Sequence, residues 1–286
     1  MKRETDSKNI YSILTAVFIM IAISCAVVLL ADKYKRWKAE DIFRKLAQST
    51  VVEHVVQPVK RPVLESVIPE DAMLTKYELK VRMLYEKYGV VVPEKNIDFD
   101  NLHKTVSEDI YAWIYLPNTN IDYPVLQHPT DNAYYLEHNL DGSEGYPGCI
   151  YTENYNSKDF TDPQTVVYGH NMRDGTMFSD LHMYEDEDFF NENKYVFFYT
   201  EDDVFAYRIF AAYQTDNLHQ LLNYNFADNE VFLRYIAHIF EIESDPQILD
   251  RDVKYDENSR LLTMSTCVMK ERQFHLRYLV QGFLLD

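Results

Sequence analysis

The longest apolar segment of the chain lies near its beginning. Residues 10–31 form a run of 22 positions without a charged side chain. A helix rises about 1.5 Å per residue, so roughly 20 apolar residues cross the hydrocarbon core of a membrane. A cleaved signal peptide would have a shorter apolar stretch that ends at small residues, whereas this run continues directly into the basic sequence at 32–36. We therefore predict an uncleaved transmembrane anchor at 10–31, preceded by a short N-terminus at 1–9.

The pattern changes twice after the anchor. Residues 32–69 contain three prolines and a valine-rich stretch without a helical period, which predicts a spacer that is helical only at its start, over 34–48. Residues 70–88 carry apolar side chains near helical spacing, and Gly89 follows as a stop signal. We expect a helix there, at the entrance to a folded domain that spans 70–286.

From about residue 108 onward, short segments of β-branched and aromatic residues dominate. The exception is a helical pattern at 229–242, capped by Asp228 or Asn229. The expected strands are 112–116, 121–126, 148–152, 165–168, 195–200, 204–213, 260–266 and 274–284. Many short strands and few helices predict a mainly β domain, either barrel-like or a sandwich, with one substantial core.

Charge and composition exclude several classes of function. The chain has 28 basic and 46 acidic residues, a formal charge of 28 − 46 = −18, and its first 45 residues carry +4 while the rest carry −22. Such an acidic body repels phosphate backbones, which excludes nucleic-acid binding through a basic surface. The seven glycines form neither GxGxxG nor GxxxxGK[ST], so a dinucleotide or Walker site is not expected.

The sequence predicts neither a metal nor a cofactor. It has no HExxH motif, and its three cysteines (Cys25, Cys149 and Cys267) form no CxxC pair, so they build neither a disulfide scaffold nor a cysteine-rich zinc site. The acidic run at 185–188 is expected to be a solvated face, and weak calcium binding is its alternative.

Three residues of the β region are candidates for chemistry. Cys267 follows an expected strand, next to hydroxyl residues, where a nucleophile would be accessible; most free cysteines, however, are small buried residues. A reactive thiol needs a proton acceptor, and His170, which follows a strand and Gly169, is better placed than His182 or His275. Arg277 lies in an apolar strand and can stabilise an oxyanion beside the cysteine, unless it is a solvated surface cation.

Five segments in order resemble the sortase family, class B most closely, from about residue 70 to the end. They are 113–125 (WIYLPNTNIDYPV), 131–136 (DNAYYL), 168–172 (YGHNM) with Met177 and Phe178, 265–267 (STC), and Arg277. The anchor, the helical lead-in and the helix near 229–242 are also similar to class B. The resemblance implies a sortase-type β-barrel with N-terminal helices, a helix before the cysteine strand and one transmembrane helix.

The resemblance also implies a function. The chain would be a membrane-anchored cysteine transpeptidase, with the N-terminus inside and the catalytic domain outside a Gram-positive cell. Cys267 would attack a sorting motif in a secreted protein and form a thioester, which an amine of the cell wall or of another protein would resolve. His170 would be the general acid and base, and Arg277 would orient the acyl group. The sorting peptide would bind at Asn132, Leu136, Tyr168, Ser265 and Thr266.

The sequence departs from class B at two positions. Val268 and Met269 follow the cysteine where an acidic residue is common in the family, so no carboxylate is assigned to the catalytic set. Cys149 replaces a smaller residue and is expected to be structural. Two other functions stay open from the sequence: a hydrolytic cysteine peptidase with the same Cys–His chemistry, and a membrane-tethered binding module in which Cys267 is inert.

Overall fold

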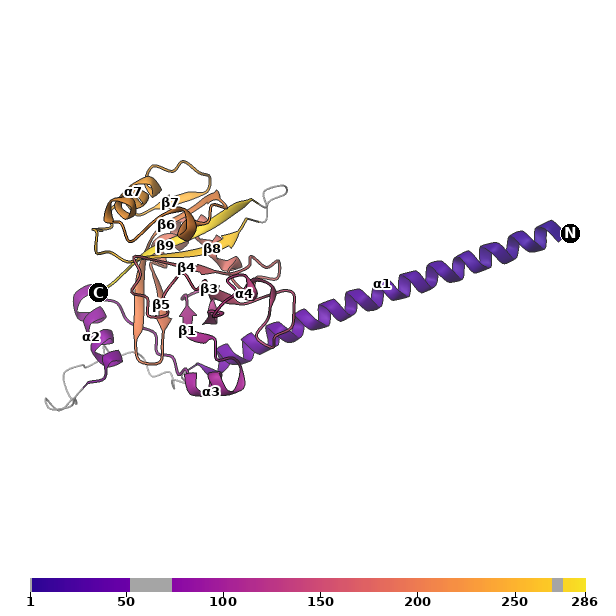
Figure 1. Ribbon diagram of the computed structural model, residues 1–286, viewed down its shortest axis with the longest axis horizontal. Coiled ribbons are helices and arrows are strands. Elements are labelled where there is room, and N and C mark those ends of the chain that lie inside the picture. The colour runs from indigo at the N-terminus through magenta and orange to yellow at the C-terminus, as the bar shows by residue number, and fades with distance from the viewer. Residues whose placement is uncertain (1, 52–73, 269–274) are drawn as a thin grey trace.

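A single closed β-sheet forms the centre of the protein (Figure 1). The structure is a computed structural model that describes residues 2–51, 74–268 and 275–286. The strands of these residues are β1 (Ile110–Tyr115), β2 (Asp122–Leu126), β3 (Ile150–Thr152), β4 (Gln164–Tyr168), β5 (Tyr195–Tyr199), β6 (Val204–Asp216), β7 (Gln247–Leu249), β8 (Leu261–Cys267) and β9 (Leu276–Leu284).

The strand order closes the sheet into a barrel. The strands follow the order β5-β1-β2-β3-β4-β8-β9-β6-β7, and an additional pairing of β5 with β6 closes the first eight into a ring. Most pairs are antiparallel, but β4 runs parallel to β8. Strand β7 extends the sheet from β6 outside this ring. The predicted mainly β, barrel-like domain is confirmed, and every expected strand is present with ends shifted by three residues or fewer.

Aromatic and β-branched side chains fill the barrel because the strands alternate inward and outward positions. Trp113, Phe198 and Tyr207 are almost completely buried in this core. Asp122 pairs with two polar groups at this core: the Trp113 indole Nε1 donates to its carboxylate at 2.7 Å, and Lys95 Nζ lies 2.6 Å from the same carboxylate.

Helices cover the barrel and lead into it. Beside the long first helix, α1 (Lys2–Ser49), they are α2 (Lys76–Tyr88), α3 (Phe99–Thr105), α4 (Tyr134–Glu137), the 3₁₀ helix η1 (Ser179–Glu185), α5 (Glu187–Glu192), α6 (Gln220–Asn223) and α7 (Asn229–Ile239). The predicted entrance helix corresponds to α2, which begins at a capping box formed by Thr75 and Glu78 and ends at Gly89 with φ +68°. The first residues predicted for it, 70–73, lie outside the described residues.

Helix α7 matches the predicted helix at 229–242, and Asp228 caps it by accepting hydrogen bonds from the backbone N–H groups of Glu230 and Val231. The apolar face of α7 packs on a second core on the outside of the barrel, where Phe210 and Phe283 stack at 4.5 Å. The chain therefore passes over α6 and α7 before it returns to the barrel at β8.

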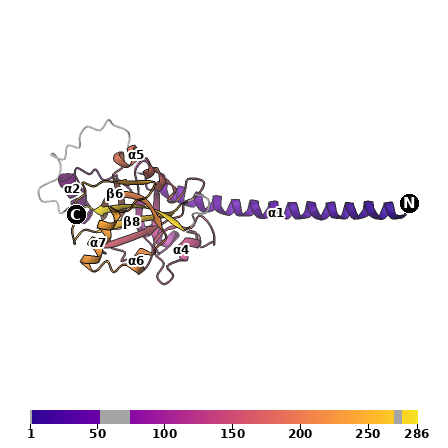
Figure 2. The ribbon, with the colours of Figure 1, turned by 90° about the horizontal axis from the view of Figure 1, so that it is seen from above.

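Helix α1 projects far from the barrel and packs on it at one end (Figures 1 and 2). From Leu14 onward its apolar part is exposed, and its length and composition make it a candidate membrane span. Its last turns contact the domain: Ala39 and Phe43 are each 2% exposed, and the Phe43 ring meets Tyr123 of β2 edge-on at 5.6 Å. The helical start expected for the spacer is therefore present and packs on the domain, whereas residues 52–69 lie outside the described residues.

Candidate active site

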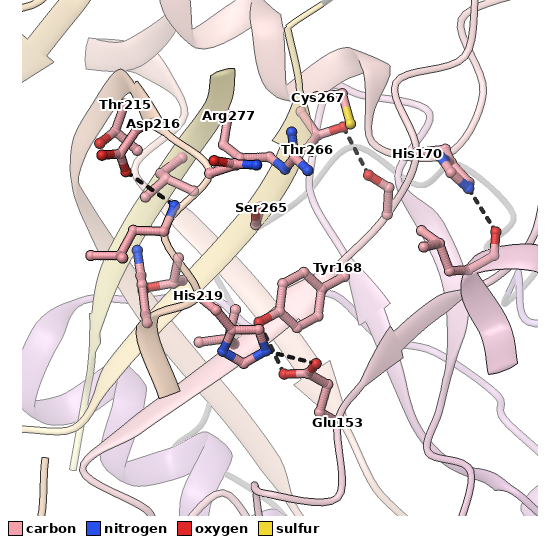
Figure 3. A pocket seen from close by; sticks show the side chains of 18 of the residues that line it. Glu153, Tyr168, His170, Thr215, Asp216, His219, Ser265, Thr266, Cys267 and Arg277 are labelled. Carbon is pink, nitrogen blue, oxygen red and sulfur yellow. Dashed lines mark hydrogen bonds and ion pairs between the residues drawn. The ribbon is translucent and has the colours of Figure 1, made fainter. Parts of the chain in front are cut away.

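Cys267 is the last residue of β8 and lies at the boundary between the core and a cleft. The preceding strand residues are buried, whereas Cys267 is partly exposed. In Figure 3 its sulfur lies on the side of the strand that faces His170. A thiol in this position is accessible, unlike a cysteine that packs in a core.

Arg277 is the cross-strand partner of Cys267. In the antiparallel pair β8–β9, Cys267 lies directly opposite Arg277. Directly opposite residues share one face of a sheet, with Cβ atoms about 5 Å apart. The return strand expected from the ten-residue separation is therefore present, and it places a guanidinium beside the sulfur.

His170 reaches the same end of the sheet from a parallel strand. Tyr168 of β4 is in register with Ser265 of β8, and the two strands run in the same direction. His170 lies two residues beyond Tyr168, as Cys267 lies two residues beyond Ser265. Parallel strands end at a common edge, so the imidazole and the thiol emerge next to each other (Figure 3).

Two glycines make room for this histidine. A Cβ on Gly169 would lie 2.5 Å from Cδ1 of Ile150 and 2.7 Å from the ring of Phe178. A Cβ on Gly148, whose φ is +68°, would lie 3.0 Å from the carbonyl oxygen of Leu136. Real Cβ atoms do not make such contacts, so larger residues at either position would displace the backbone around His170.

The surroundings of His170 fix its tautomer and its charge. Its Nε2 donates a hydrogen bond to the backbone oxygen of Leu136 at 2.7 Å. A neutral imidazole then carries its lone pair on Nδ1, which is free to accept a proton. Burial lowers the pKa of His170 below its usual value; the hydrogen bond to Leu136 opposes this, and the charge of Arg277 reinforces it. His170 is therefore neutral at neutral pH.

A hydrogen-bond network holds the backbone carbonyl group of Cys267. Asn171 Nδ2 donates to the backbone oxygen of Cys267 at 2.8 Å and contacts Nε2 of His182 at 2.9 Å. His182 Nδ1 lies 2.7 Å from Glu185, and its ring stacks on Tyr278. His182, one alternative to His170, thus contacts the main chain of Cys267. His275, the other alternative, is exposed just before β9.

The cleft beside these residues has a volume of about 200 Å³. Four of the five predicted peptide-binding residues line it: Leu136, Tyr168, Ser265 and Thr266. Thr266 is 2% exposed, and its hydroxyl donates to the backbone oxygen of Gly169 at 2.8 Å. Asn132 is not among the lining residues; its side-chain oxygen accepts a hydrogen bond from the backbone of Asn154 at 2.7 Å.

The far end of the cleft contains a polar pair that the sequence did not indicate. His219 Nε2 lies 2.9 Å from Glu153, and the hydroxyl of Tyr168 donates to the same carboxylate at 3.1 Å (Figure 3). The two members of the pair are 66 positions apart, in loops without a recognisable motif, so no sequence pattern could have joined them.

The remaining predictions concern Cys149 and metal binding. Cys149 is 1% exposed, its thiol contacts the backbone oxygen of His138, and burial raises its pKa well above the usual value. These properties fit the structural role expected for it. The acidic residues at 185–188 are exposed, and Asp186 caps α5. Among the residues that the structure describes, no group of three or more His, Cys, Asp or Glu side chains could hold a metal ion.

A family comparison agrees with this arrangement. A model of the sortase domain family matches residues 114–284, which include β2 to β9 and all three candidate catalytic residues. The chain belongs to the sortase family.

Individual relatives identify the class. Sortase B of Listeria monocytogenes is 31% identical over 180 residues, which cover 63% of this chain and 71% of the relative. The crystal structure of Clostridium perfringens sortase B is 31% identical with a TM-score of 0.58, and the match covers 66% of this chain and all of that one. A Staphylococcus aureus sortase B–substrate complex is 25% identical with a TM-score of 0.58, over 73% of this chain and 92% of that one.

These matches confirm the resemblance to class B sortases. Sortases are cysteine transpeptidases, so this sortase is an enzyme of that type. Family membership decides against an inert binding module and favours acyl transfer over simple peptide hydrolysis.

Proposed function

We propose that this sortase cleaves a sorting peptide at Cys267, with His170 as the proton carrier and Arg277 as the group that orients the acyl carbonyl. The observation that carries the proposal is the strand register around the cleft. Cys267 pairs directly with Arg277, and His170 occupies the equivalent position at the end of the parallel neighbour β4.

In the first half of the reaction, neutral His170 accepts the thiol proton on Nδ1. The thiolate of Cys267 adds to the carbonyl carbon of the scissile bond, and the carbon–nitrogen bond breaks. The imidazolium of His170 returns its proton to the departing amine. The product is a thioester on the sulfur and a free amine, so atoms and charges balance.

Arg277 acts on the charge that develops during this step. The carbonyl oxygen becomes an oxyanion when the sulfur adds, and a guanidinium on the neighbouring strand is positioned to stabilise it. The same positive charge lowers the pKa of His170, which keeps the imidazole in its proton-accepting form.

In the second half, an amine attacks the thioester carbon and the carbon–sulfur bond breaks. His170 accepts the proton of the amine and returns it to the sulfur, which restores the thiol. We propose that the amine belongs to a cell-wall peptide or to another protein. The sorting peptide occupies the cleft lined by Leu136, Tyr168 and Ser265, with Thr266 and Asn132 as further predicted contacts.

The proposed location follows from α1. The apolar part of this helix spans the membrane once, with the N-terminus in the cytoplasm and the catalytic domain outside the cell. The support, within the part of the chain that the structure describes, is one long apolar helix whose C-terminal turns pack on the domain.

A panel of sorting peptides tests the proposal. We expect one class of peptide to form a covalent adduct on Cys267, detectable by mass spectrometry, and to give a transfer product when an amine is supplied. The Cys267→Ala variant should form no adduct. His170→Ala and Arg277→Ala should each lose about 10²–10⁴-fold in rate.

The matched control is Cys149→Ala, because this second thiol is buried and outside the cleft. This variant should retain the adduct and the transfer product. Full activity of Cys267→Ala, or an adduct that forms on Cys149 instead, would contradict the proposal.

A further inference from the structure

A second pocket opens on the other side of the catalytic pair. It has a volume of about 550 Å³, and its walls include Arg36, Tyr146, Asn171, Arg173 and Asp174. The residues that it shares with the peptide cleft are His170 and Cys267. In Figure 3, these two side chains lie at the opposite end of the cleft from Asp216 and His219. The sulfur and the imidazole therefore separate two pockets.

This arrangement matches a reaction with two substrates. Once the acyl group is attached to the sulfur, its peptide still occupies the cleft. The attacking amine must then reach the thioester carbon from elsewhere, and it must pass close to a proton acceptor. The second pocket meets both requirements because it is separate from the peptide cleft and His170 lines both; the Nε2 hydrogen bond to Leu136 leaves Nδ1 of His170 unprotonated.

One wall of the second pocket comes from the membrane anchor. Arg36 belongs to α1, and the helix is held in place from Ala39 onward by burial against the domain. Lys38 lies 3.2 Å from Asp141, which adds a surface ion pair to this contact. Arg36 lies one turn before the docked residues, so its position relative to Cys267 is set by the packing of α1.

The same contact extends to the opposite wall. The Phe43 ring packs on Tyr123, whose hydroxyl accepts a hydrogen bond from the backbone N–H of Met177 at 3.1 Å. Met177 in turn forms a backbone bridge with Asn171. The docked helix is therefore connected through Tyr123 and Met177 to the loop that carries Asn171, Arg173 and Asp174.

The charges of the second pocket indicate what it binds. Two guanidinium groups, from Arg36 and Arg173, flank it, although the chain after residue 45 is strongly acidic. Arg36 already pairs with Asp32 one turn away, but a guanidinium has five donors and can serve a second carboxylate. Asp174 contributes the single carboxylate among the wall residues named above; it already accepts hydrogen bonds from Thr176 and shares one with Glu40 of α1.

We propose that this pocket binds the acceptor, a peptide with a primary amine and a nearby carboxylate, and that Arg36 of the anchor helix pairs with that carboxylate. This inference rests on the proposed function and adds to it the acceptor site. The step is the aminolysis described above: a carbon–nitrogen bond forms, the carbon–sulfur bond breaks, and the proton of the amine passes through His170 to the sulfur.

Two small amines test the inference on the full-length protein in detergent. Glycylglycine has an amine and a carboxylate, whereas glycylglycinamide has the same amine and an uncharged end. We expect wild-type protein to have a KM about two- to fivefold lower for glycylglycine, the effect of a partly exposed ion pair. In Arg36→Gln this preference should disappear, and in Arg36→Gln combined with Arg173→Gln the KM for glycylglycine should rise further.

The matched control is Arg82→Gln, since Arg82 is also a half-exposed helical arginine paired with an acid one turn away, on α2. It should behave like the wild type. Normal acyl-enzyme formation with an unchanged preference in Arg36→Gln would overturn the inference. Absence of acyl-enzyme before any amine is added would instead contradict the proposed function.

Discussion

At the scale of single residues, the position of His170 depends on the missing Cβ of Gly169 as well as on a hydrogen bond of the imidazole. His170 follows Gly169, whose missing Cβ leaves space for Ile150 and Phe178. The imidazole is then fixed by one hydrogen bond to the Leu136 carbonyl, which assigns the proton to Nε2 and the lone pair to Nδ1. The imidazole is thus oriented by a hydrogen bond to the main chain.

The titration of His170 provides a test at this scale. Burial and the charge of Arg277 lower its pKa, so the neutral form persists as the pH falls through 6.5. We expect the NMR titration of the His170 ring to have a midpoint below 6.5. In Arg277→Gln the midpoint should move upward, because one of the causes of the shift is removed.

Arg82→Gln serves again as the control, since it removes a cation far from the cleft and should leave the His170 midpoint unchanged. A midpoint above 6.5 in the wild type, or no upward movement in Arg277→Gln, would contradict this account of the site.

The three candidate catalytic residues could be predicted from the sequence because each lies at a recognisable strand end or in a strand of unusual composition. Cys267, His170 and Arg277 needed only the strand pattern and the family motifs. The pair of Glu153 and His219 could not be predicted, because a hydrogen bond between two loops produces no periodic pattern in the sequence of either loop. Asn132 matched a family position, yet its side chain caps a loop at Asn154 instead of lining the cleft.

At the scale of elements, the register of β8 and β9 determines the chemistry. A shift of β9 by one residue would turn Arg277 to the other face of the sheet. Buried neighbours disfavour this shift, since Tyr278 of the barrel core and Leu279 of the outer core would have to exchange sides of the sheet. The pairing of sulfur and guanidinium is therefore maintained by apolar residues that take no part in the reaction.

The C-terminal turns of α1 form a second important contact at this scale, with the surface of the domain. Phe43 is the central side chain of this contact. Because Phe43 is buried, Phe43→Ala should cost about 3–5 kcal/mol of packing free energy at this contact. We expect the amides of residues 39–48 to exchange hydrogen faster while the barrel strands keep their protection. Transfer to an amine should weaken, and acyl-enzyme formation should be unchanged.

Val17→Ala provides the comparison, since Val17 lies in the exposed apolar part of the same helix. Faster exchange throughout the barrel in Phe43→Ala would contradict the view that α1 docks as a separate contact on a domain that is stable by itself.

Long elements with a clear pattern could be predicted, whereas several of the shortest could not. Helices α2 and α7 have caps and apolar faces, and the strands β8 and β9 are seven and nine residues long. Strand β7 has three residues, and α4 and α6 have four each, too few to show a period. Strand β7 forms because it pairs with β6, and α4 contacts β3; only the tertiary structure provides such contacts.

At the scale of the whole molecule, the three cysteines lie in three different environments. Cys25 is in the apolar part of α1, Cys149 is buried in the domain, and Cys267 is accessible from the cleft. A thiol reagent that cannot cross membranes therefore reports on Cys267 and on the side of the membrane where it lies.

In intact cells, we expect such a reagent to label the chain once, at Cys267, as identified by peptide mass spectrometry. Cys267→Ala should remove the label, and Cys149→Ala should not. Labelling that requires permeabilised cells would mean that the catalytic domain faces the cytoplasm, which would contradict the proposed topology.

The continuity of α1 from Lys2 to Ser49 has a mechanical consequence. An uninterrupted helix transmits rotation as well as distance: each added residue advances the axis by about 1.5 Å and turns it by about 100°. Inserting one residue between Ala31 and Arg36 would rotate the cleft by about a quarter-turn around the helix axis. Inserting seven residues would move the cleft about 10 Å along the axis and nearly restore its original orientation. The length of this one helix would therefore determine both the distance of the catalytic domain from the lipid surface and its orientation around the helix axis.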